Sequence, residues 1–167
     1  MDRETEQGIE WDVQKTLRQY YHYVDQREYE KATALFTPDV DWEVMGLRVG
    51  SHEDMLEALQ KSLGSDTIRH VLTNTLVTVI DEDHATARSY NTLYYTAGAR
   101  IEEQDGPFEF EGPHRTHDAY AELVRTPDGW RIAKRRSSMI FRRNPDEPVT
   151  LETWSKESGK AICAAQL

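Results

Sequence analysis

A histidine before a long run of β-branched residues is the first candidate for chemistry in this sequence. His70 precedes VLTNTLVTVI, and ATARSYNTLYYT follows after a short polar turn. The even length of this turn would let Ile80 pair with Ala85, and directly opposed residues share a face of a sheet. Absent a bulge, the side chains expected beside His70 are Asn74, Ser89, Asn91 and Tyr95. Since histidine exchanges protons readily near neutral pH, this face suits acid–base chemistry on a bound small molecule.

Three side chains near the end of the first amphipathic segment form a second candidate group. Asp25 directly follows residues 9–24, Tyr21 lies one helical turn before it, and Tyr20 lies near the same face. Either phenol could polarise a carbonyl as an oxyanion donor. Trp42, in the next extended segment, could supply an aromatic wall. Together these residues suit a pocket for a small, largely apolar molecule.

The same residues also have structural interpretations. Asp25 and Glu28 have the spacing of a capping box for the following helix, with Asp in place of Ser or Thr. A histidine at the start of a strand, such as His70, is often a hydrogen-bonded core or rim residue. Asn74 and Asn91 could equally be internal hydrogen-bond partners. Both kinds of role therefore stay open for each residue.

Several kinds of catalytic site are excluded or disfavoured by the sequence. Cys163 is the one cysteine, so a disulfide within the chain and a C-x-x-C zinc or redox site are excluded. His114 and His117 are three residues apart, and on a strand they would point to opposite faces, which argues against a metal site. No glycine-rich phosphate loop and no usable Ser–His–Asp order occurs. We therefore expect chemistry without a metal or cofactor.

Helices come first along the chain and long strands follow. Apolar residues recur at spacings of three and four in the opening segment, which indicates an amphipathic helix. Later segments change to a period of two, which indicates strands. The expected helices are 9–24, 28–36 and 51–64, and the expected strands are 40–44, 71–80, 85–96, 115–125 and 130–142. Residues 98–113 form a long loop of the kind that often serves as a lid.

This order of elements predicts an α+β domain over residues 1–143, followed by a tail over 144–167. The helices would cover one face of a sheet with four long antiparallel strands. The other face would then need a cover of its own. A second copy of the chain is the simplest cover, so we expect a homodimer or homotrimer. The tail would pack on the pocket mouth or on a neighbouring subunit.

Bulk composition narrows the partners. The 167 residues, 38% hydrophobic and 30% charged, fit one globular domain, and the formal net charge of −10 argues against nucleic acid. The basic run Lys134-Arg135-Arg136 would alternate between faces of a strand, so it would not form one patch. No apolar run approaches the roughly 18 residues of a membrane span. The N-terminus is acidic and polar, unlike a signal peptide, so we expect a cytoplasmic protein.

Several segments, taken in order, resemble a known family. They are YYHYVDQREYEKATALFTPDVDWEV, a glycine-bounded helix, RHVLTN, the returning strand ATARSY, and VRTPDGWRIAKR. This series is similar to SnoaL-like proteins of the nuclear transport factor 2-like superfamily, over roughly residues 10–142. The resemblance implies the superfamily's cone-shaped fold, in which helices pack on a curved antiparallel sheet around a ligand pocket.

The resemblance also implies roles for individual residues. In the dehydratase and dehydrochlorinase branches, an aspartate after the first helix pairs with a histidine at the start of the long hairpin, and Asp25 and His70 match these places. Tyr20 matches a tyrosine five residues ahead of the aspartate in the bile-acid dehydratase. Val24 stands where scytalone dehydratase has a tyrosine. The second pocket histidine of that enzyme has no clear equivalent in ARSYNTLYYT.

The expected function is therefore cofactor-independent acid–base catalysis by Asp25 and His70, as a lyase, dehydratase, isomerase or cyclase. The resemblance implies an aromatic, terpenoid or polyketide-like substrate. Two other functions occur in the superfamily. One is a non-catalytic small-molecule binding module, and the other is the small subunit of a ring-hydroxylating oxygenase. Convergence of the polar groups in one pocket would favour the enzyme over the binding module.

Overall fold

The computed structural model of the chain describes residues 1–44, 46–63, 66–96, 101, 107–108 and 112–143. Its elements, in chain order, are α1 (Arg3–Asp25), α2 (Tyr29–Thr33), β1 (Phe36–Val44), β2 (Leu47–Val49), α3 (His52–Leu63), β3 (Thr67–Val79), β4 (His84–Thr96), β5 (Arg115–Thr126) and β6 (Gly129–Arg142). The expected tail, Gly64 and most of the expected lid loop lie outside the described residues.

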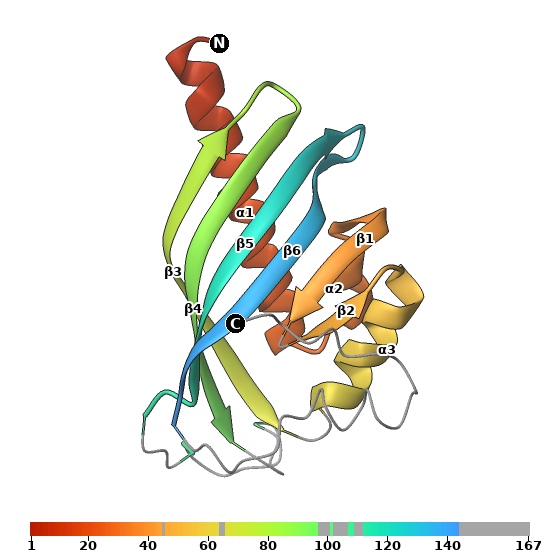
Figure 1. Cartoon of the computed structure of the whole chain (residues 1–167), viewed down its shortest axis with the longest axis vertical. Helices are drawn as coiled ribbons and strands as arrows, with labels where there is room; N and C mark the ends of the chain where they lie inside the picture. The colour runs from red at the N-terminus through yellow and green to blue at the C-terminus, as the bar shows by residue number, and fades with distance from the viewer. Residues whose placement is uncertain (45, 64–65, 97–100, 102–106, 109–111, 144–167) are drawn as a thin grey trace.

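One six-stranded sheet in the order β2-β1-β6-β5-β4-β3 forms the body of the molecule. The four long strands pair antiparallel, as expected. β1, however, pairs parallel to β6, so the sheet is mixed and the expectation of an antiparallel sheet is wrong at this edge. Figure 1 shows α1 crossing one face of the bent sheet, with α2 and α3 beside β1 and β2. The α+β class is confirmed.

α1 is longer than its apolar pattern predicts. It begins at Arg3 because the Asp2 side chain caps it by accepting a hydrogen bond from the Thr5 backbone N–H at 2.8 Å. Glu4 and Glu6 then lie in the first turn, where negative side chains are favoured by the helix dipole. The buried side chains are Ile9, Val13, Thr16, Leu17, Tyr20, Tyr21 and Val24. This buried stripe brings Tyr20, Tyr21 and Asp25 to the inner face of the sheet.

The second helix is shorter than expected, and the strand after it begins earlier. α2 ends at Thr33, and β1 begins at Phe36, which the sequence places in the helix. Pairing with β6 is the reason, because Phe36 lies opposite Ile132, whose N–H donates to the Leu35 carbonyl at 2.8 Å. Pro38 is tolerated in β1 because it falls in an irregular stretch of the ladder.

A longer turn and a bulge in β3 together overturn the expected register of the long hairpin. Val79, not Ile80, pairs with Ala85, and Leu72, not Asn74, pairs with Asn91. Asn74 lies in the bulge with φ of 51°, and its side chain is exposed. The grouping of Asn74 with His70 is therefore wrong, because the extra residue interrupts the alternation of side chains.

Asn74 also allows a test of this bulge. A φ near 51° lies in the left-handed region, which asparagine and glycine tolerate and alanine does not. Asn74→Ala is therefore expected to lower the free energy of unfolding by about 1 kcal/mol, and Asn74→Gly by a few tenths. Urea unfolding of both variants measures the difference. Equal losses in the two variants would contradict a left-handed residue at this position.

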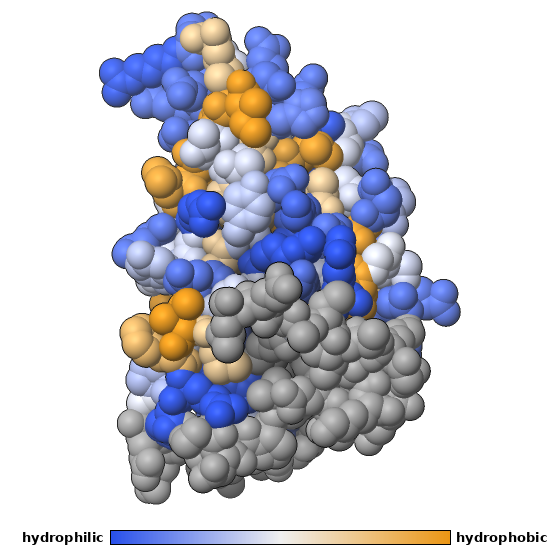
Figure 2. Space-filling model, viewed as in Figure 1, coloured by the Kyte–Doolittle hydropathy of each residue, from blue (hydrophilic) through white to orange (hydrophobic). Residues whose placement is uncertain are grey.

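The two faces of the sheet differ in character. The face toward α1 carries the core, which includes Phe36, Trp42, Val77, Leu123 and Ile132. No helix among the described elements covers the opposite, outer face, on which charged side chains surround separate hydrophobic patches (Figure 2).

Within the described ranges, no helix has the length and apolar character needed to cross a membrane.

Candidate active site

Asp25 and His70 are in direct contact on the inner face of the sheet. Asp25 is the last residue of α1, and its Oδ1 lies 2.5 Å from Nδ1 of His70 on β3. Its Oδ2 accepts a second hydrogen bond, at 2.8 Å, from the backbone N–H of His70. Both side chains are largely buried, with 9% and 14% of their area exposed. Because both carboxylate oxygens bind the same residue, the imidazole is held in one orientation.

The geometry contradicts the capping interpretation of Asp25. Glu28 is the N-cap residue of α2, and no side chain makes a capping hydrogen bond there. The Asp25 carboxylate instead binds His70, which lies 45 positions later in the chain. A carboxylate only accepts hydrogen bonds, so Nδ1 of His70 carries the proton. In the neutral imidazole, Nε2 is then unprotonated and can act as a base.

The two tyrosines of α1 form an aromatic wall beside the histidine. The ring centroids of Tyr21 and His70 are 5.0 Å apart, and those of Tyr20 and Tyr21 are also 5.0 Å apart. Tyr20 packs edge-on against Phe36, with ring centroids 5.4 Å apart. Burial raises the pKa of Tyr20 to about 12, although the charge of nearby Arg135 opposes this shift. Tyr20 therefore stays protonated at neutral pH.

Strands β4, β5 and β6 supply a polar floor. Ser89 and Asn91 are buried on the inner face of β4, and Asn91 lies opposite His117 on β5. His117 is also buried, and its Nδ1 lies 3.1 Å from the hydroxyl of Ser137 on β6. The buried Oδ1 of Asn91 has no hydrogen-bond partner in the described part of the chain. Asn91 can therefore bind a polar group of a ligand.

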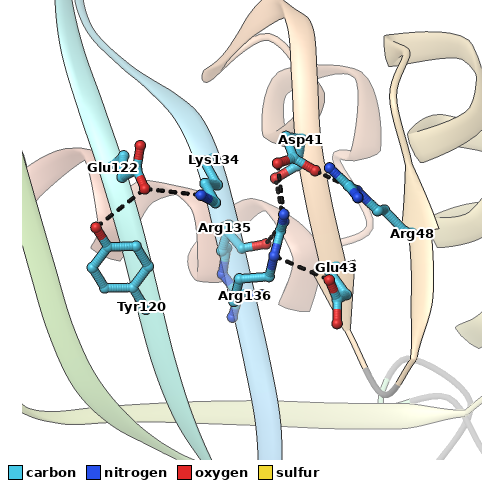
Figure 3. Close-up of polar contacts among 8 residues, drawn as sticks. All are labelled: Asp41, Glu43, Arg48, Tyr120, Glu122, Lys134, Arg135 and Arg136. Atoms are coloured by element: carbon cyan, nitrogen blue, oxygen red, sulfur yellow. Dashed lines mark hydrogen bonds and ion pairs between the residues drawn. The ribbon is translucent and has the colours of Figure 1, made fainter. Parts of the chain in front are cut away.

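One cation of the basic run on β6 turns into this site. The Arg135 guanidinium donates a hydrogen bond to the Tyr21 hydroxyl and lies 5.2 Å from the centroids of both tyrosine rings. Figure 3 shows Lys134 and Arg136 among carboxylates on the opposite face of the sheet. The expected alternation of this run is confirmed. It places one basic residue inside and its two neighbours outside.

The remaining expected residues lie at different places. Trp42 is buried on β1 directly opposite Arg135, next to the tyrosines. Tyr95 lies opposite Ile68, and its hydroxyl donates to Asp66 at 2.7 Å. Its ring packs against that of His114 at a tilt of 38°, with centroids 4.7 Å apart. The structure thus gathers Asp25, His70, Tyr20, Tyr21, Trp42, Ser89 and Asn91, leaves Tyr95 toward one end of the sheet, and separates Asn74.

The floor contains groups that the sequence analysis missed, namely His117, Ser137 and Arg135. His114 and His117 are both buried. His114 precedes β5, so the alternation expected of two strand residues does not apply to this pair. The ladder between β5 and β6 has a register shift after Thr116, which leaves Ile140 as an extra residue in β6. A second register shift leaves Ala133 as an extra residue in β6, since Lys134 pairs with Glu122 but Ile132 with Leu123. The sequence signal that could have indicated these residues is the presence of polar side chains at positions of a strand where apolar ones are expected.

His117 is held neutral by its surroundings. Burial, with the nearby charges of Arg135 and Arg115, lowers its pKa from 6.5 to about 3. A neutral histidine bonded to a serine suits hydrogen bonding to a ligand.

Within the described ranges, no group of three or more His, Cys, Asp or Glu side chains could hold a metal ion.

The shift at His117 predicts a pH dependence of stability. Its pKa is lower in the folded chain than its ordinary 6.5, so the unfolded chain binds more protons between pH 6.5 and about 3. Stability is therefore lost as the pH falls through this window, by at most about 1.4 kcal/mol per pH unit. His117→Asn is expected to flatten this dependence, measured by urea unfolding at intervals from pH 7 to pH 4.5. Parallel curves for the two proteins would contradict the assignment.

Sequence comparison identifies the family. The SnoaL-like domain profile matches residues 9–136. Uncharacterized proteins of Mycobacterium tuberculosis and Mycobacterium bovis are 31% identical to the chain over an alignment of 137 residues, and the alignment covers 79% of this chain and 86% of theirs. The family match therefore includes the end of α1, the start of β3 and β6 as far as Arg136.

Solved structures share the fold at low identity. The protein called Putative Scytalone Dehydratase from Novosphingobium aromaticivorans aligns with a TM-score of 0.72 and 14% identity, over 89% of this chain and 95% of that one. A Mycobacterium tuberculosis protein of unknown function aligns with a TM-score of 0.73 and 21% identity, over 95% and 92%. An NTF2-like protein with a cystatin-like fold from Novosphingobium aromaticivorans has a TM-score of 0.65 and 20% identity, over 86% of both chains. The cone-shaped, NTF2-like α+β fold is thereby established.

Proposed function

Because this chain belongs to the SnoaL-like domain family, we propose that it is a cofactor-independent lyase or isomerase in which His70 transfers protons and Asp25 orients it. The observation that carries this proposal is the direct contact of Asp25 Oδ1 with His70 Nδ1 at 2.5 Å, on the buried face of the sheet. Polar groups that converge in this way favour an enzyme over a passive binding module. The name of the solved relative called Putative Scytalone Dehydratase, which shares the fold, agrees with this class of reaction.

The proposed chemistry begins with proton removal. Nε2 of His70 takes a proton from a substrate carbon next to a carbonyl, while the ionised Asp25 stabilises the imidazolium through Nδ1–H. In a dehydration, the electron pair of the broken C–H bond forms a C=C bond and hydroxide leaves from the neighbouring carbon. The imidazolium returns its proton to the hydroxide, which departs as water. In an isomerisation, the proton returns instead to another carbon.

The walls of the site favour a largely apolar substrate. Tyr20, Tyr21 and Trp42 are 3%, 5% and 3% exposed, so they contribute buried aromatic surface beside the dyad. Aromatic walls with a few placed polar groups are typical of sites for small organic molecules. We therefore propose an aromatic, terpenoid or polyketide-like substrate that carries a carbonyl.

A substrate screen with an isotope readout tests this function. The chain would be incubated in D₂O, without added metal, with a panel of aromatic, terpenoid and polyketide-like β-hydroxy ketones and acids. Mass spectrometry then detects loss of water or incorporation of deuterium next to the carbonyl. Both the proton transfer and the elimination should depend on His70 and Asp25. Turnover that both Asp25→Asn and His70→Gln retain within a few-fold would reject the dyad.

A further inference from the structure

Arg135 is a buried cation without a carboxylate partner in the described part of the chain. Its side chain is 3% exposed, and its contacts there are one hydrogen bond to the Tyr21 hydroxyl and the two tyrosine rings. Guanidinium groups stay ionised even when buried. A buried charge is costly unless an opposite charge or several hydrogen bonds compensate it. An anion bound beside Arg135 would therefore stabilise its buried charge.

The neighbouring cations on β6, in contrast, form ion pairs with carboxylates. Arg136 binds Asp41 at 2.6 Å and Glu43 at 3.0 Å, and Lys134 binds Glu122 at 3.1 Å. Arg136 and Arg48 lower the pKa of Asp41, although partial burial of this carboxyl opposes the shift. These cations share the outer face with carboxylates, and Arg135 contributes only its backbone carbonyl to the cluster drawn in Figure 3.

The space beside Arg135 has the size of a single oxygen atom. A cavity of about 10 Å³, the space that one water molecule needs, lies against Arg135 and Tyr21. Small side chains from β4 and β5 leave this space open, namely Ala87, Ser89, Ala119 and Ala121. A larger residue at any of them would fill it. The cavity thus offers an oxygen a place beside the Arg135 side chain, with Ser89 among its lining residues.

We propose that Arg135 and the adjoining cavity form an oxyanion subsite that binds an anionic oxygen of the substrate, such as a carboxylate or an enolate. This inference rests on the proposed function and narrows its substrate class to oxygen acids and compounds that form an enolate. Tyr21 links the subsite to the base, since it accepts a hydrogen bond from Arg135 and its ring lies against that of His70, with centroids 5.0 Å apart. Negative charge that develops on a carbonyl oxygen when His70 removes a proton would be stabilised there.

A pair of probes of nearly equal shape tests the subsite without any turnover. Cinnamate carries a carboxylate, and cinnamamide replaces it with a neutral amide. Isothermal titration calorimetry of the whole chain at pH 7 is expected to give a Kd for cinnamate at least about tenfold lower than that for cinnamamide, because hydrogen bonds to charged groups are the stronger ones. In Arg135→Met the two Kd values are expected to become nearly equal, and Arg135→Lys is expected to keep part of the preference.

Two control variants separate this inference from the proposed function. Arg136→Met removes a neighbouring cation from the outer face and should leave the preference for cinnamate intact. His70→Gln should also keep it, because the base does not bind the anion. An equal Kd for the two probes in the unaltered chain would overturn the subsite, and so would an unchanged preference in Arg135→Met. Retained preference with no turnover of any substrate would instead reject the dyad alone.

Discussion

Replacement of His70 by glutamine is expected to lower turnover of a converted substrate by roughly 10²–10⁴-fold, the usual contribution of a general base. Glutamine can still donate a hydrogen bond to Asp25, but it cannot take up a proton. The buried contact at 2.5 Å would thus be replaced by a neutral hydrogen bond of similar reach. Steady-state kinetics measure the effect, and the loss should fall mainly on kcat because the walls that bind substrate are unchanged.

Asp25→Asn is expected to cause a loss within the same range. The amide keeps a hydrogen-bond acceptor for Nδ1 of His70 but removes the negative charge that stabilises the imidazolium. Because the two residues act as one unit, the double variant should be no slower than the slower single variant by more than a few-fold. Losses that multiply in the double variant would show that the two side chains act independently.

The chain contains a matched control for this experiment. His84 and Asp81 also form a His–Asp pair, with Nδ1 2.9 Å from Oδ1, but both side chains are more than half exposed at the turn between β3 and β4. His84→Gln is expected to leave kcat and KM unchanged within twofold. Equal damage from His84→Gln and His70→Gln would show that loss of stability, and not loss of the base, explains the effect.

Phe36→Ala is expected to lower the free energy of unfolding by about 3–5 kcal/mol, the usual cost of truncating a buried phenylalanine. Phe36 is 2% exposed and packs edge-on against Tyr20. It also begins β1 opposite Ile132, where the parallel pairing with β6 starts. Urea unfolding followed by tryptophan fluorescence measures the loss. Activity of the folded variant should fall as well, since loss of the Phe36 ring leaves a void behind Tyr20, which is part of the aromatic wall of the site.

Phe141 is the control for this substitution, because its side chain is 69% exposed near the end of β6. Phe141→Ala should change the free energy of unfolding by about 0.5 kcal/mol or less. Similar losses at Phe36 and Phe141 would contradict the core packing described for the start of β1.

Much of the frame can be predicted from periodicity alone. The spacing of Ile9, Val13 and Leu17 is sufficient to predict α1, and the change to a period of two predicts the four long strands. The Asp25–His70 contact cannot be predicted from periodicity, because the two residues are far apart in sequence and secondary-structure propensity carries no information on distant contacts. A resemblance over several segments supplied that pairing, and the structure confirms the contact.

Register is the part that periodicity could not supply. Each bulge adds one residue to one strand, and from there every later side chain exchanges faces. Asn74 is lost from the site for this reason, and Arg135 is gained. The parallel pairing of β1 with β6 was also hidden, since its partner strand lies almost a hundred positions later in the chain. Local pattern determined the elements, and tertiary pairing determined which side chains meet.

The extra residue at Ala133 has a consequence for how relatives of this chain should be aligned. It decides which of three consecutive basic residues faces inward, because a strand of the same length paired without this bulge would turn Lys134 and Arg136 toward the tyrosines and Arg135 toward solvent. A homologue could keep every basic residue and still lose the inward guanidinium. Gap placement in this strand is therefore as informative about ligand preference as residue identity is.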